Sequence, residues 1–269
     1  MTDWLDARME DRRPGLLGWL RVALRGTALA LVIYGGLALL LLVRLVERPL
    51  CGAHRPVTPW ITQGACRAAI LILGLRFRVH GRPMQEPGAV VANHGSWLDI
   101  FTLNACQRVY FVSKSEVSAW PGIGWLAKAT GTLFINRRGR EAKAQQRLFE
   151  ERLAEGHRIL FFPEGTSTDA TRILPFKSTL FAAFFAPGQA RGLAIQPMTV
   201  IYRAPEGEDP RFYGWWGDMD FAPHLLKLLA APRQGSVEVR FNEPLPVEAF
   251  ADRKALAQAC ETMVRAGFY

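Results

Sequence analysis

A histidine and an aspartate follow directly on a short apolar run, Val90–Ala92. They are His94 and Asp99, in the stretch NHGSWLD. A neutral imidazole can take a proton from a hydroxyl group near neutral pH, and a carboxylate can fix its tautomer and stabilise the imidazolium. The pair predicts general-base chemistry, with His94 as the base and Asp99 as its partner. In the alternative, Ser96 and Asp99 only cap a helix and His94 is an ordinary turn residue.

Two more apolar runs, 132–135 and 158–162, also end on side chains that suit substrate binding. Ligands of α/β sheets bind beyond the carboxyl ends of the strands, so polar groups there are candidates for a site. Arginine also binds phosphate and carboxylate in a bidentate way. The alternatives are a solvated basic turn and an exposed surface turn. The candidate residues are Arg137, Arg138, Glu164, Gly165, Thr166 and Ser167.

From residue 76 onward, apolar runs alternate with amphipathic ones, which predicts an α/β domain over 76–269 with a mixed sheet flanked by helices. We expect strands at 76–80, 89–92, 109–112, 132–135, 158–162, 194–202 and 236–241. We expect helices at 98–106, 122–129, 140–155, 175–186 and 252–266. The aromatic, turn-rich stretch 204–218 predicts a long loop, either near a membrane or substrate mouth or as an irregular surface excursion.

Residues 1–75 are expected to form an N-terminal membrane anchor of two helices. Residues 26–43 are 18 residues without a charge, about 27 Å of helix against a bilayer core of about 30 Å. Arginines flank this run almost equally on both sides, so the positive-inside rule gives no orientation. A membrane-embedded hairpin, with 57–75 as its returning arm, satisfies both flanks better than a single span. We expect the cytoplasmic face of the inner membrane, with the catalytic domain facing the cytoplasm.

The composition narrows the classes of partner. The net charge of +9 favours anionic partners, and beside an apolar N-terminus this indicates membrane lipids. No zinc-finger, RNA-recognition or helix-turn-helix pattern is present, so no nucleic acid is expected. The four cysteines are scattered without a CxxC, which argues against a disulfide framework or a zinc site.

Four stretches in order, NHGSWLD, GTLFINR, FPEGT and IQPMTV, resemble the four motifs of the glycerolipid acyltransferase family over about residues 75–245. The resemblance implies O-acyl transfer from an acyl carrier protein or CoA thioester to the hydroxyl of a lysolipid, with no cofactor and no metal. It assigns the chemistry to His94 and Asp99. It implies that Arg137 contacts an anionic headgroup and that Glu164 and Gly165 shape the acceptor pocket. Asn93, Arg138, Thr166, Ser167 and Lys177 are also expected to bind substrate.

The third motif departs from the family pattern at one position. Many members that use a phosphate acceptor have EGTR, whereas this chain has Ser167 in place of the arginine. The text around FPEGTSTDATRILPFK and YGWWGDMDF resembles more closely the branch that acylates lyso-ornithine lipid, which has no phosphate. We therefore expect a lyso-ornithine lipid acceptor, with 1-acylglycerol-3-phosphate, and hence phosphatidic acid synthesis, as the alternative.

Two other classes of protein share some of these features. A metal hydrolase also uses His, Asp and Glu, but the sequence has no HExxH or HxH and its other histidines are isolated. A non-catalytic membrane scaffold explains the apolar N-terminus and the charge, but not a His-Asp pair at a strand end.

Overall fold

The computed structural model describes residues 4, 13–135, 142–185 and 192–269. The described strands form one sheet in the order β1-β7-β6-β2-β5-β3-β4, with β8 paired to β6. Neighbouring strands are parallel except where β6 meets β7 and β8. The strands are β1 (Arg76–His80), β2 (Gly88–Ala92), β3 (Tyr110–Lys114), β4 (Leu133–Ile135), β5 (Ile159–Phe161), β6 (Ala194–Arg203), β7 (Ser236–Phe241) and β8 (Leu245–Pro246).

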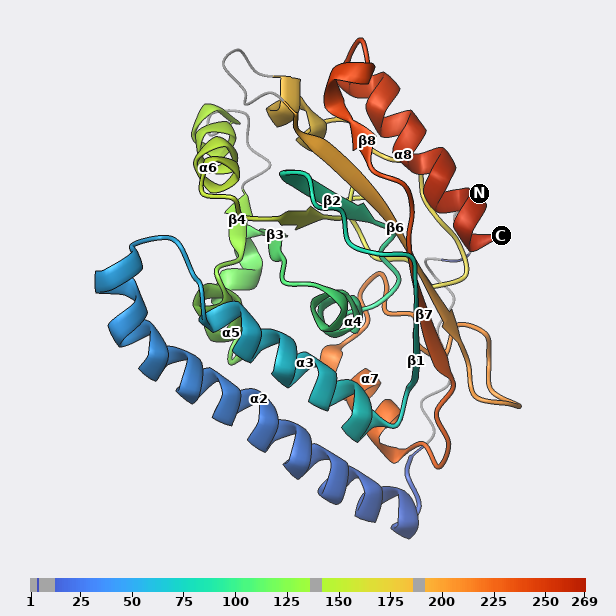
Figure 1. Cartoon of the computed structure of the whole chain (residues 1–269). Coiled ribbons are helices and arrows are strands. Elements are labelled where there is room, and N and C mark those ends of the chain that lie inside the picture. Colours follow the sequence, from blue (N-terminus) through green and yellow to red (C-terminus); the bar gives the residue numbers. More distant parts are fainter. Residues whose placement is uncertain (1–3, 5–12, 136–141, 186–191) are drawn as a thin grey trace.

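Helices cover both faces of this sheet, as Figure 1 shows. One face packs against α2, α3, α4 and α7, and the other against α6, α8 and the 3₁₀ helix η3. The helices are α2 (Leu16–Cys51), α3 (Thr58–Leu73), α4 (Asp99–Cys106), α5 (Ile123–Thr130), α6 (Ala142–Ala154), α7 (Phe221–Ala230) and α8 (Arg253–Phe268). The 3₁₀ helices are η1 (Ser115–Ala119), η3 (Leu180–Phe185) and η4 (Val247–Ala249).

Alternate residues of the central strand β2 fill two separate cores. Ala89 and Val91 belong to the core beneath α6 and α8, while Val90 and Ala92 belong to the core beneath α3 and α4. Side chains alternate between the faces of a strand, so a strand covered on both faces is apolar at every position. This explains why the run before the His-Asp pair carries no polar residue, and it makes the strand a rigid support for the pair.

The helices α2 and α3 form an antiparallel hairpin along the lower edge of the molecule in Figure 1. α2 has 36 residues, about 54 Å of helix, and it is long and apolar enough to cross a membrane. Its outward face is a row of exposed leucines: Leu16, Leu17, Leu20, Leu24, Leu31, Leu39, Leu41, Leu42, Leu45 and Leu50. The turn of the hairpin is fixed by the buried Glu47 carboxylate, which accepts hydrogen bonds from the backbone N–H groups of Val57 and Thr58.

Arginines of the hairpin hold the C-terminal ends of three helices of the remaining chain. Arg25 donates to the carbonyls of Leu229 and Ala231 at the end of α7, at 3.2 and 2.7 Å. Arg55 donates to Ala129 in the last turn of α5 at 2.7 Å. The last carbonyls of a helix lack partners within it and carry its negative dipole end, so cationic donors are stabilising there.

Arg67 completes the set at the end of α4, where it donates to Ala105 at 2.9 Å. The arginines that flank the apolar run in the sequence are thus partly used to fasten the hairpin to the rest of the protein.

All seven expected strands are present, two with the expected ends and the others with ends shifted by one or two residues, and the mixed α/β architecture is confirmed. The helix expected at 175–186 is wrong over its first half, where residues 175–177 have no regular secondary structure and the backbone N–H groups of Phe176 and Lys177 bond to Glu261 and to Pro163. The described part is the 3₁₀ helix η3. The helix α7 and the short strand β8 were missed.

Candidate active site

The candidate site lies at one edge of the sheet, where three parallel strands end. β2 pairs in parallel with β5 on one side and with β6 on the other. The carboxyl ends of all three strands therefore lie at the same edge. His94 follows β2 and Glu164 follows β5, so two stretches about 70 residues apart in the sequence come together, as expected for a ligand site of an α/β sheet.

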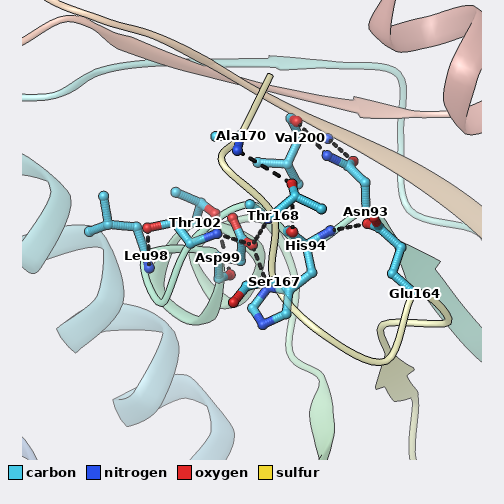
Figure 2. Close-up of polar contacts among 12 residues, drawn as sticks. Asn93, His94, Leu98, Asp99, Thr102, Glu164, Ser167, Thr168, Ala170 and Val200 are labelled. Carbon is cyan, nitrogen blue, oxygen red and sulfur yellow. Dashed lines mark hydrogen bonds and ion pairs between the residues drawn. The ribbon is translucent and has the colours of Figure 1, made fainter. Parts of the chain in front are cut away.

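His94 and Asp99 form a direct pair, drawn in Figure 2. The imidazole Nδ1 lies 2.7 Å from Asp99 Oδ2. The Asp99 side chain is fully buried, whereas the His94 side chain is 19% exposed. Because a carboxylate accepts the proton on Nδ1, Nε2 is the ring nitrogen that can accept a proton from a substrate.

The Asp99 carboxylate also binds the backbone of the turn between the two residues. Asp99 Oδ2 also accepts hydrogen bonds from the backbone N–H groups of Gly95 and Ser96, at 2.9 and 3.1 Å. These bonds hold the turn that precedes α4 and are not helix caps, because the N-cap of α4 is Leu98 and this end has no side-chain cap bond. Ser96 is not the N-cap, because α4 begins at Asp99 itself. The capping that the alternative requires is therefore absent at this helix end, and the one Asp99 carboxylate both orders the turn and pairs with His94.

Glu164 braces the backbone of His94 from the neighbouring strand end. Its Oε1 accepts the His94 backbone N–H at 2.7 Å, and its Oε2 accepts the N–H of Leu174 at 2.6 Å. Burial raises the pKa of the Glu164 carboxyl to about 8, against the lowering effect of these two bonds. A carboxyl held in this way fixes the position of the base and the course of the loop that follows β5.

That loop lies directly against the turn from His94 to Asp99, which we name the catalytic turn after its expected role. Thr168 donates its backbone N–H and its hydroxyl to the His94 carbonyl, at 2.8 and 3.2 Å. Ala170 is held at a positive φ of 61°, and a Cβ on Gly95 would lie 2.9 Å from the Ala170 Cβ. The glycine in NHGSWLD is therefore required by the close approach of the two loops.

The aromatic loop expected at 204–218 packs against the catalytic turn and against the loop after β5. The backbone N–H of Trp215 donates to the Gly95 carbonyl at 3.0 Å, and a Cβ on Gly214 would clash with the Asp169 carbonyl. Phe212, among others in this stretch, is buried. The stretch is thus a third wall of the catalytic turn rather than an irregular excursion.

The His94 ring is also fixed from its face. It stacks on Phe162 with ring centroids 4.0 Å apart and an angle of 10° between the planes. Phe162 stands between β5 and Glu164, so the strand end that supplies the brace also supplies the stacking surface. A flat apolar contact of this kind restricts rotation of the ring and leaves its edge nitrogens free to exchange protons.

The other expected binding residues lie at different depths. Asn93 is buried, and its amide pairs with both the N–H and the carbonyl of Val200, at 2.8 and 2.9 Å. Thus Asn93 extends the bonding between β2 and β6, and a role in substrate binding stays a prediction for it. Ser167 is buried next to Thr168, whereas Thr166 and Lys177 are exposed on the same loop. Arg137 and Arg138 lie outside the described residues.

Two contacts of the catalytic turn were not foreseen from the sequence. The Tyr202 hydroxyl donates to Asp99 Oδ1 at 2.7 Å. The Trp97 indole N–H donates to Nδ1 of the buried His224 on α7, at 2.8 Å. Burial and the charge of Lys227 lower the pKa of His224 to about 3, so the ring is neutral and can accept this bond. Tyr202 lies two residues beyond the fourth motif, and that position is the one signal that could have marked it.

Within the described part of the chain, no three His, Cys, Asp or Glu side chains are grouped as metal ligands. The chemistry of the assembled groups is that of a base with an oriented partner. His94 can take a proton from a hydroxyl group, and Asp99 can stabilise the imidazolium that forms.

Comparison with known proteins identifies the family to which this chain belongs. The model of the Acyltransferase family matches residues 76–201. The chain is 63% identical over 265 residues to the lyso-ornithine lipid O-acyltransferase of Rhodobacter capsulatus, over 98% of this chain and 96% of the relative. It is 38% identical over 210 residues to a 1-acyl-sn-glycerol-3-phosphate acyltransferase of Neisseria gonorrhoeae, over 77% and 79% of the two chains.

A solved structure shares the fold. The crystal structure of the 1-acyl-sn-glycerophosphate (LPA) acyltransferase PlsC from Thermotoga maritima matches 94% of this chain and 93% of its own, with a TM-score of 0.61 and 21% identity. Similarity to the Rhodobacter capsulatus relative over nearly the full length, together with the family model over a range that includes His94, Asp99 and Glu164, establishes that this chain belongs to the acyltransferase family and is an acyltransferase.

Proposed function

We propose that this enzyme transfers a fatty acyl group to the free hydroxyl of lyso-ornithine lipid and so makes ornithine lipid. The observation that carries the proposal is the 63% identity to the Rhodobacter capsulatus enzyme of that name over nearly the whole of both chains. The departure at Ser167 supports it, because the arginine expected in a phosphate-binding EGTR motif is absent.

In the proposed reaction, His94 moves the protons and Asp99 stabilises its charged form. His94 Nε2 removes the proton from the acceptor hydroxyl as the oxygen attacks the thioester carbonyl. The tetrahedral intermediate collapses, the new ester forms and the C–S bond breaks. The proton on His94 then passes to the departing thiolate, which leaves as the free thiol of the carrier. Asp99, 2.7 Å from Nδ1, stabilises the imidazolium between the two transfers.

The donor is an acyl thioester of acyl carrier protein or of CoA. Either donor supplies the same reacting carbonyl, and His94 serves both in the same way. The acceptor brings the only nucleophile that the reaction needs, which explains why a His-Asp pair suffices without a serine or cysteine nucleophile of the enzyme.

A second acceptor, 1-acylglycerol-3-phosphate, is favoured by the 38% identity to the Neisseria gonorrhoeae enzyme. The two acceptors are separated by one experiment. The purified full-length protein is given an acyl thioester and each lysolipid in turn, and the product is identified by mass. We expect ornithine lipid to form faster than phosphatidic acid. Product from 1-acylglycerol-3-phosphate alone would refute the proposed acceptor.

We further propose that the hairpin lies in one leaflet at the cytoplasmic face of the inner membrane. α2 is fastened to α7 near its N-terminal end by Arg21 and Arg25, and it packs along α3. A helix that crossed the bilayer would place its two ends on opposite sides, although Arg25 near one end and Arg55 beyond the other both bond to helices of the remaining chain. A helix lying flat instead buries its row of leucines and leaves the catalytic turn beside the membrane surface.

Thiol labelling tests this arrangement in whole cells. The native Cys51 at the end of α2 is exposed, and Arg13→Cys places a second thiol just before the helix. An impermeant reagent should label neither thiol until the inner membrane is opened. Labelling of one of them in intact cells would show that α2 spans the membrane.

A further inference from the structure

The buried carboxylate of Asp99 has a hydrogen-bond partner outside the catalytic turn, the hydroxyl of Tyr202 on β6. Oδ2 receives the bonds from His94, Gly95 and Ser96, all from the catalytic turn. Oδ1 receives the Tyr202 hydroxyl at 2.7 Å. Tyr202 stands near the end of β6 and is itself buried.

Two oxygens held from opposite sides fix the rotation of a carboxylate. With donors on Oδ2 alone, the group can turn about its last single bond and exchange its two oxygens. The bond from Tyr202 removes this freedom, because β6 is paired with β2 over Ala194–Met198 and with β7 over Met198–Arg203, so Tyr202 cannot follow the movement. The side chain of Asn93 extends the same strand pairing at Val200, two residues before Tyr202.

The tyrosine acts in this contact as a donor. Burial, together with the nearby charge of Asp99, raises the pKa of the Tyr202 phenol well above its usual value of 10. The phenol therefore keeps its proton throughout the working range of the enzyme. A neutral hydroxyl that donates to a carboxylate stabilises the charged form of that carboxylate and lowers its affinity for a proton.

We propose that Tyr202 is a positioning residue of the acyl-transfer reaction, whose hydroxyl holds the Asp99 carboxylate ionised and oriented toward His94. The proposal rests on His94 as the base and does not depend on which lysolipid is the acceptor. It predicts two effects of losing the hydroxyl. The base is less well oriented, which lowers kcat, and the His-Asp pair binds a proton more tightly, which moves the acid limb of the pH–rate profile upward.

The test is Tyr202→Phe in the full-length enzyme, assayed with whichever lysolipid the wild type acylates. We expect kcat to fall about 10- to 100-fold, the range of one hydrogen bond to a charged group. The KM for the lysolipid should change little, and the acid limb of kcat/KM should move to higher pH.

Tyr213→Phe is the matched control. Tyr213 is also fully buried, and its hydroxyl bonds to Gln234 and to the Gly235 N–H, away from Asp99. Its ring lies 5.6 Å from that of Tyr202. The control should lose stability without a change in the acid limb. If Tyr202→Phe shows the unchanged profile of the control, Tyr202 is only a packing residue and the proposal is wrong.

A second replacement keeps the test decisive if Tyr202→Phe does not fold. A ring-fluorinated tyrosine at position 202 retains the hydroxyl and makes it a stronger donor. The acid limb should then move to lower pH, opposite to the effect of phenylalanine. An acid limb that stays in place in the folded fluorotyrosine enzyme would overturn the proposal.

Discussion

The Nε of Arg67 donates a hydrogen bond of 2.9 Å to the carbonyl oxygen of Ala105. Arg67 belongs to the hairpin, and Ala105 lies in the last turn of α4, the helix whose first residue is Asp99. Gln63 of the same hairpin reaches the same carbonyl at 3.3 Å. The apolar hairpin therefore holds the C-terminal end of the helix whose first residue is Asp99.

This contact predicts that hairpin and active site are not independent. Arg67→Met keeps the apolar stem and removes the donor, and Gln63 remains as a weaker partner. We expect the unfolding free energy to fall by about 1 kcal/mol or less, because the side chain is partly solvated, and the melting temperature by up to about 4 °C. Thermal unfolding in detergent measures this, with Arg48→Met, an exposed arginine of α2, as the control. Equal effects of the two substitutions would contradict the role of Arg67.

The catalytic pair gives the largest expected change in activity. His94→Ala and Asp99→Asn should each lower acyl transfer by about 10²- to 10⁴-fold with the fold intact. The double variant should lose little more than either single one, because the residues act as a unit. Steady-state turnover of the three variants is compared with that of His80→Ala, a histidine exposed on β1. Near-normal turnover of both single variants would leave Asp99 only with the role of ordering the turn before α4.

The sheet and the contact between His94 and Asp99 could be predicted because their signals are local. A strand buried on both faces is an apolar run in the sequence, and His94 and Asp99 stand in a short motif directly after such a run. The segment 175–186 failed for a non-local reason, since the partners of its N–H groups lie at Pro163 and Glu261. Tyr202 was invisible for the same reason, because 103 residues separate it from Asp99.

The contacts of the hairpin arginines also could not be predicted from the sequence. In the sequence, Arg25, Arg55 and Arg67 are flanking charges that favour no orientation in a membrane. In the structure they bond to helix ends, so part of the charge counted for the membrane is used inside the protein. Only the arrangement of α4, α5 and α7 reveals this, and no periodicity in the sequence encodes it.

Glu164 predicts a pH dependence of stability. Its pKa is raised from 4.5 to about 8 by burial, so the folded protein holds a proton there that the unfolded chain releases near 4.5. The resulting stabilisation is complete below about pH 4.5 and is lost as the pH rises to about 8. Glu164→Gln removes the titration. The advantage in unfolding free energy of the wild type over this variant should shrink between pH 5 and 8 and then stay constant, as measured by urea unfolding.

The exposed Glu206 supplies the comparison for that experiment, because Glu206→Gln removes a carboxyl at the surface. Its difference from the wild type should vary much less over the same range. A difference for Glu164→Gln that grows with rising pH would mean that the buried carboxyl is ionised in the folded protein, with the two backbone N–H bonds outweighing burial.

The acceptor is tested most directly at Ser167. A phosphate acceptor carries about two negative charges and favours several fixed cations, whereas lyso-ornithine lipid brings its own cation beside its carboxylate. Ser167 is buried in the loop that binds the His94 carbonyl through Thr168, so a side chain at this position lies next to the catalytic turn. Ser167→Arg supplies the guanidinium of the EGTR pattern.

We expect this variant to shift the preference toward 1-acylglycerol-3-phosphate by about 1–3 kcal/mol, the strength of a hydrogen bond to a charged group. Both acceptors are offered together at equal concentration, and the two products are counted by mass for wild type and variant. Ser167→Gln is the control, since it adds a long polar side chain without charge and should leave the ratio nearly unchanged. If Ser167→Arg and Ser167→Gln change the ratio equally, the missing charge does not select the acceptor, although the acyl transfer at His94 would stand.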